Sequence, residues 1–152
     1  MRALPLFLAV VAAAAAGTAP ATAAPPSSIG IEMSGQFSGP NSVSGSFTSR
    51  IGTVEDSGTY TETFGIDGDT IDSVKVLSAS RGIIVLTVHG FVETPSPTSV
   101  TFRGGRWQVL FGTGAYAGLK ARGRPGVTGS ADLAAGTVRV RHRGKARLRP
   151  GS

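Results

Sequence analysis

The segment Thr137–Leu148 reads T-V-R-V-R-H-R-G-K-A-R-L and alternates between two kinds of residue with a period of two. Successive side chains of a β-strand point to opposite faces, so this period predicts a strand with one basic and one apolar face. The basic face comprises Arg139, Arg141, Arg143, Lys145, Arg147 and Arg149, and the other face comprises Val138, Val140, His142, Ala146 and Leu148. The segment therefore predicts a half-buried strand near the C-terminus.

Similar extended segments occupy most of the chain before it. Ile29, Ile31, Met33 and Phe37 alternate with small or polar residues, which is typical of another half-buried strand. Further strands are predicted over residues 43–48, 53–64, 71–77, 83–88, 98–103, 106–111 and 119–128. Roughly eight or nine short strands without a long helix indicate a sandwich or a barrel. We expect an all-β fold, a single antiparallel β-barrel of about eight strands.

Turn residues predict how these strands connect. Thr94–Thr98 contains two prolines and predicts a loop, and Gly104-Gly105 predicts a tight turn that joins 98–103 to 106–111 as a hairpin. The chain has 22 glycines and 9 prolines, which suits short strands joined by tight turns.

A second hairpin is expected at the C-terminal end, where the last two predicted strands meet about Asp132 and Leu133. That pairing places Arg124 near Arg141, Arg122 near Arg143 and Lys120 near Lys145. Like charges directly across a ladder are destabilising. A basic cluster that opposes folding in this way suggests that it binds an anionic partner.

Residues 1–23 have the pattern of a secretory signal peptide, with Met-Arg, an apolar run over Ala3–Ala16 and the small residues Ala21–Ala24. The run of about 14 apolar residues is shorter than the roughly 20 that span a bilayer. Cleavage after Ala23 predicts one barrel domain over 24–152. Since the chain has no cysteine, neither a lipid anchor nor a disulfide is expected. We expect a secreted protein, extracellular or associated with the cell envelope.

Basic residues gather in the C-terminal half of the chain. The formal net charge is +6, yet residues 24–100 are acidic overall, and Asp132 is the single acid from Thr101 onward. The expected anion-binding residues are Lys120, Arg122, Arg124, Arg139, Arg141, Arg143, Lys145 and Arg147. They predict an anionic surface polymer or lipid headgroup as partner, or else a solvated face that discourages edge-to-edge aggregation. No aromatics are interleaved, which disfavours specific nucleic-acid binding.

Candidate catalytic residues come from one segment. Asp56, Tyr60 and Glu62 share a face of the strand predicted over 53–64. If that face points into the barrel, apolar surroundings raise carboxyl pKa values and suit general acid–base chemistry. A bulge at Gly58 would interrupt the alternation and place Asp56 on the opposite face from Tyr60 and Glu62.

Metal and cofactor chemistry finds little support. His89 and His142 are the only histidines, and neither has a second ligand or a nucleophile at an informative spacing. Asp67, Asp69 and Asp72 lack the terminal glutamate of a calcium loop and are interpreted as turn residues. No metal and no cofactor are expected.

A glycine-rich turn follows the strand at Trp107 and reads G-T-G-A-Y-A-G over Gly112–Gly118. A dinucleotide fingerprint needs a helix after its glycines, and the later glycines and Pro125 leave no room for one. The stretch resembles the G-T-G-x-[YF]-A-G-x-x-G signature of the allene oxide cyclase and dirigent-like barrel superfamily. The resemblance implies a β-barrel in which Gly112, Gly114 and Gly118 shape a structural turn and Tyr116 packs under the barrel. No position outside the glycine turn matches the plant enzymes' catalytic residues, so enzymatic activity does not follow from the resemblance.

These observations favour a secreted, non-enzymatic small barrel protein. Its basic strands are expected to bind an anionic envelope component, and its interior to accept an apolar small ligand. The alternative is a cyclase, isomerase or dirigent-type enzyme that acts on an apolar substrate inside the barrel with Asp56, Tyr60 or Glu62. A third interpretation is a homo-oligomer, because Ile83–Val88 is apolar on both faces and suits either a central strand or a subunit interface.

Overall fold

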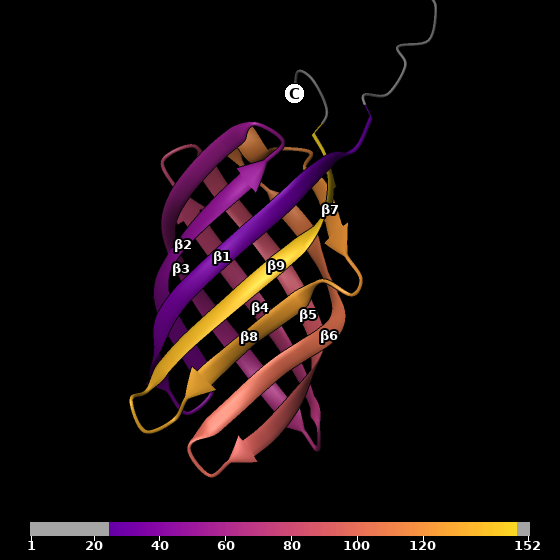
Figure 1. Ribbon diagram of the computed structural model, residues 1–152. Coiled ribbons are helices and arrows are strands. Elements are labelled where there is room, and N and C mark those ends of the chain that lie inside the picture. The colour runs from indigo at the N-terminus through magenta and orange to yellow at the C-terminus, as the bar shows by residue number, and fades with distance from the viewer. Residues whose placement is uncertain (1–24, 149–152) are drawn as a thin grey trace, which may run out of the picture.

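Nine β-strands form one antiparallel sheet in the computed structural model, which describes residues 25–148 (Figure 1). The strands are β1 (Ser27–Gly39), β2 (Ser42–Ile51), β3 (Val54–Asp67), β4 (Thr70–Ala79), β5 (Gly82–Ser96), β6 (Ser99–Gly112), β7 (Lys120–Gly123), β8 (Val127–Asp132) and β9 (Thr137–Arg147). A single turn of 3₁₀ helix, η1 (Gly114–Tyr116), lies between β6 and β7.

The sheet closes on itself as a barrel. β1 to β6 are neighbours in chain order, and β9 pairs with β1 to complete the circle. β7 and β8 both pair with β6 on one side and β9 on the other, along successive parts of those strands (Figure 1). They fill one position in the barrel, interrupted at Arg124–Gly126, so nine strands make eight positions. The predicted all-β fold with a single antiparallel β-barrel of about eight strands is confirmed.

The two ends of the barrel differ in their connections. The β2–β3 and β4–β5 turns and η1 lie at one end, which we call the closed end. The β1–β2, β3–β4, β5–β6 and β8–β9 turns lie at the other, which we call the open end. Figure 1 shows the closed end at the top.

The predicted alternation separates the barrel interior from its surface. In β9, Val138, Val140, His142 and Ala146 are buried, whereas the basic residues between them are exposed. The large side chains of the core gather toward the closed end, where Phe47, Ile84, Leu86, Trp107 and Leu119 are almost inaccessible to solvent. The closed half is therefore filled.

The predicted hairpin at Gly104-Gly105 is wrong. β6 runs unbroken through both glycines, which have φ values of 65° and 72° and form a bulge opposite β5. A Cβ at Gly105 would lie 2.2 Å from the His89 carbonyl oxygen, so only glycine fits there. The hairpin turn instead lies at Pro97-Thr98, because β5 extends through most of the predicted loop to Ser96.

The C-terminal hairpin forms, but its predicted register is wrong. It is centred between Ala134 and Ala135 rather than at Asp132 and Leu133, because Asp132 accepts a hydrogen bond from the Ala135 amide and Gly136 has a φ of 68°. Like charges still face each other across the ladder. The facing pairs are Lys120 with Arg147 and Arg122 with Lys145, Thr128 lies opposite Arg141, and Arg124 lies in the interruption between β7 and β8.

The predicted signal peptide and Arg149 lie outside the described residues. Within residues 25–148, no helix is long and apolar enough to cross a membrane.

Candidate functional site: a half-hollow barrel

A cavity of about 260 Å³ occupies the open half of the barrel. Its walls are mainly apolar and include Phe37, Phe64, Val88, Phe102, Val138 and Val140. Pro40, Ile66 and Leu133 also line it, and all three are exposed on hairpin ends or turns at the open end. They mark an apolar mouth through which the cavity meets solvent.

A buried ion pair lines the same cavity. Glu62 of β3 and Lys75 of β4 lie directly opposite each other in the ladder, and both side chains point inward. The Lys75 ammonium contacts the Glu62 carboxylate, and the two side chains are only 3% and 7% exposed. Burial lowers the pKa of Lys75, while the Glu62 charge and hydrogen bond act against that shift.

His142 of β9 lines the cavity without a hydrogen-bond partner. The side chain is completely buried, and neither Nδ1 nor Nε2 has a partner. Its ring lies 5.7 Å from the ring of Trp107, whose own Nε1 donates instead to the Arg143 carbonyl. Burial, with the charge of Lys75, lowers the pKa of His142 to about 3. The Arg141 backbone carbonyl acts in the opposite direction but does not reach hydrogen-bonding geometry with the ring.

The three predicted catalytic residues share the inward face of β3 but are not brought together. Glu62 lines the cavity, whereas Tyr60 and Asp56 lie progressively nearer the closed end and do not. The Tyr60 hydroxyl is buried without a partner, and burial followed by the Glu62 charge raises its pKa. Asp56 accepts a hydrogen bond from the Tyr116 hydroxyl, which lowers the Asp56 pKa. The expected rise in carboxyl pKa is therefore wrong for Asp56.

Tyr116 covers the closed end of the barrel. It ends η1, is buried, and donates its hydroxyl to Asp56 across the barrel end. Gly114 and Gly118 flank it with φ values of 57° and 73°. A Cβ at Gly112 would lie 2.3 Å from the Tyr116 carbonyl oxygen, so this turn needs glycine for space as well as for conformation.

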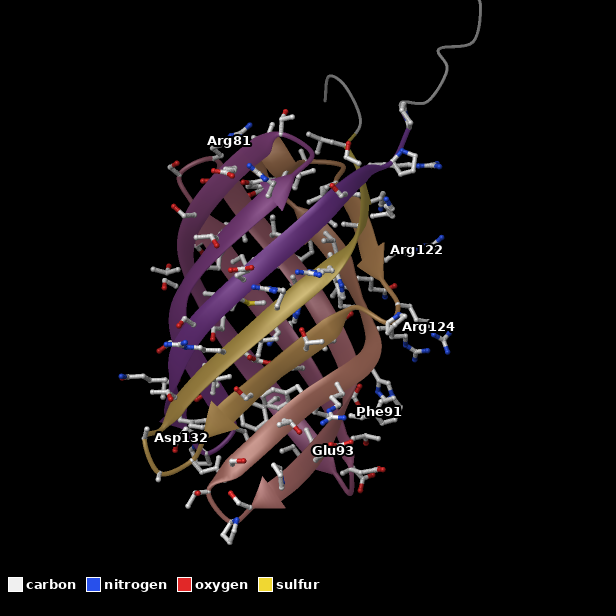
Figure 2. All side chains as sticks on the ribbon, viewed as in Figure 1. Arg81, Phe91, Glu93, Arg122, Arg124 and Asp132 are labelled. Carbon is white, nitrogen blue, oxygen red and sulfur yellow. The ribbon has the colours of Figure 1, made fainter. Side chains whose placement is uncertain are left out.

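The predicted anion-binding residues form a basic stripe along the outer face of β7 and β9. Arg124, between β7 and β8, belongs to the same stripe. Figure 2 shows Arg122 and Arg124 pointing away from the barrel. Within residues 25–148, Arg141 alone among the stripe has an acidic partner, Glu32 of β1 at 2.7 Å. The basic stripe comprises Lys120, Arg122, Arg124, Arg139, Arg141, Arg143, Lys145 and Arg147.

The β5 strand is apolar on both faces, as its sequence predicts. Ile84, Leu86 and Val88 point into the core, whereas Val85 lies on the outer face between Val76 of β4 and Phe111 of β6. Phe111 is 54% exposed, so an apolar cluster remains on the surface. The subunit interface that this strand suggests stays a prediction.

Sequence reasoning missed Lys75 and His142 as site residues. Both had a signal: each interrupts a set of apolar residues on one face of a predicted strand. His89 lies on the outer face, where its Nδ1 is 2.8 Å from the Asp72 carboxylate. Among the described residues, no group of three or more histidine or acidic side chains is placed to hold a metal ion.

The fold and the cavity define a small, half-hollow, antiparallel β-barrel whose apolar interior contains the polar side chains of Glu62, Lys75 and His142. No family model, curated protein or solved structure matches this chain. The resemblance to the allene oxide cyclase and dirigent-like superfamily therefore stays a hypothesis that rests on Gly112–Gly118.

Proposed function

We propose that this protein is a secreted, non-enzymatic barrel that binds a small apolar molecule in its open half. The observation that carries the proposal is the apolar cavity of about 260 Å³ with an exposed apolar mouth. A closed apolar cavity of about 150 Å³ is large enough for benzene, and drug-sized ligands need roughly 300 Å³ or more. A molecule of one or two rings, or a short chain, matches this space.

Filling the cavity tests the proposal. Ala131 of β8 is buried and lines the cavity, so the ring of Ala131→Phe would occupy the ligand's space. We expect the substitution to weaken binding of naphthalene by about tenfold or more in isothermal titration. Thr128→Phe adds the same ring to the exposed face of the same strand and should leave the affinity unchanged. Equal binding by both variants, or no binding by the wild type, would contradict the proposal.

A second proposed activity is binding of an anionic envelope component by the basic stripe. Two directly facing pairs of like charge, with no acid beside them among the described residues, oppose folding and support a counter-charged partner. The stripe lies on the outer face of the barrel, so both activities are compatible.

Neutralising part of the stripe tests the second activity. Near an anionic membrane each basic residue contributes about 1 kcal/mol, so Arg143→Gln, Lys145→Gln and Arg147→Gln together should weaken binding to phosphatidylglycerol vesicles by about 100-fold. The matched control is Thr59→Glu, Thr61→Glu and Thr63→Glu, which changes net charge equally on the exposed face of β3. Co-sedimentation should show a much smaller loss for the control. The same loss in both variants would mean that net charge alone, and not the stripe, governs binding.

The alternative function, a cyclase or isomerase, draws on Glu62, because it alone of the three candidate residues lines the cavity. It predicts that an apolar substrate is converted, and that neutralising the basic stripe leaves this turnover intact.

A further inference from the structure

A buried polar group without a partner usually marks a ligand, a water or a functional role, because leaving it unpaired costs about 1–3 kcal/mol. His142 is such a group: neither ring nitrogen has a hydrogen-bond partner, and the residue lines the cavity proposed for the apolar ligand. The neighbouring donors are engaged elsewhere: Trp107 donates to the Arg143 carbonyl, and Lys75 is held by Glu62. The Arg141 backbone carbonyl is near the ring but lies outside hydrogen-bonding geometry.

We propose that the cavity selects an uncharged apolar compound that carries one hydroxyl group, and that this hydroxyl hydrogen-bonds to His142. The inference rests on the proposed function, since it specifies the ligand of that cavity. A neutral imidazole has one N–H donor and one bare nitrogen acceptor, and a hydroxyl can complement either of them. The apolar body of the compound then lies along Val138, Val140 and Phe102 toward the mouth.

The charges around the cavity disfavour an ionised ligand. A carboxylate placed near His142 would meet the Glu62 carboxylate, and the nearby Lys75 is already paired with that group. An ammonium would lie beside Lys75. Arg103 also lines the cavity, but its side chain is 70% exposed and lies 3.5 Å from Glu93, so it leaves the deep part of the cavity without a free charge. Burying an uncompensated ion there would be costly.

Three compounds with the same ring system test the inference: naphthalene, 1-naphthol and 1-naphthoate. We expect the full mature protein to bind 1-naphthol about tenfold more tightly than naphthalene at pH 7, and 1-naphthoate more weakly than either. In His142→Phe, which keeps an aromatic ring next to Trp107, 1-naphthol and naphthalene should bind equally within about twofold. The difference between compounds, measured in both proteins by titration, isolates the hydroxyl–imidazole interaction.

A spectroscopic readout keeps the test independent of how well the variant folds. In the wild type, ¹⁵N NMR should show a His142 ring nitrogen shifting when 1-naphthol is added and staying in place with naphthalene. Equal affinities for these two compounds in the wild type would overturn the inference while leaving the apolar-ligand proposal intact. Tightest binding of 1-naphthoate would also overturn it, in favour of an anionic ligand. Failure of all three compounds to bind would overturn both proposals.

Discussion

Glu62→Gln is expected to destabilise the protein by about 3 kcal/mol, because it leaves the buried Lys75 ammonium without its counter-charge. The Lys75 and Glu62 side chains are only 3% and 7% exposed, so solvent compensates poorly for the lost carboxylate. Urea denaturation of the wild type and the variant measures the difference in free energy of unfolding.

Two controls make the result specific to the buried pair. Glu62→Gln combined with Lys75→Met removes both charges and should recover most of the lost stability, since an apolar replacement of a buried pair is often neutral or stabilising. Glu55→Gln breaks the Arg50–Glu55 pair, whose side chains are mostly exposed, and should cost less than about 1 kcal/mol. If the double variant were as unstable as Glu62→Gln alone, the ion pair would not be the cause.

Acidification is expected to destabilise the wild type by about 2.5 kcal/mol between pH 7 and pH 4.5 through His142 alone. The pKa of His142 is lowered to about 3 in the folded barrel, against 6.5 in the unfolded chain. As the pH falls below 6.5, the unfolded chain binds a proton that the folded protein excludes, so stability decreases by about 1.4 kcal/mol per pH unit until the folded pKa is reached.

His142→Phe should remove this dependence and leave stability nearly constant over the same pH range. Denaturation curves at several pH values compare the two proteins. The effect of Asp56 can be separated from that of His142, because the lowered pKa of Asp56 affects stability mainly as the pH falls below its ordinary value of 3.8. An unchanged pH slope in His142→Phe would mean that His142 is protonated or solvated in the folded protein.

Local patterns predicted the strands well where a strand has one buried and one exposed face. Ile29–Phe37 and Thr137–Leu148 alternate clearly, and β1 and β9 lie there. The same reasoning failed at Gly104-Gly105, because positive φ values serve a bulge as well as a hairpin turn. Only pairing with β5 along the whole of β6 distinguishes the two.

The candidate site was predictable in part. The alternation of side chains along the strand placed Glu62 and Tyr60 on one face of β3, which the structure shows to be the inward face. It could not tell which of the two lines the cavity. Lys75 has the same parity as Leu77, and a lysine on an apolar face gives no hint of its partner. The partner follows from the β3–β4 register, which places Glu62 directly opposite.

By itself, the sequence determined the all-β fold, the two faces of the clearly alternating strands and the position of the basic stripe, because a side-chain period of two is a local property of the extended chain. The tertiary structure decided that the barrel is filled at one end and hollow at the other. That outcome depends on how the side-chain volumes of strands far apart in the chain add up at each level, and on the registers that bring Glu62, Lys75 and His142 to one cavity.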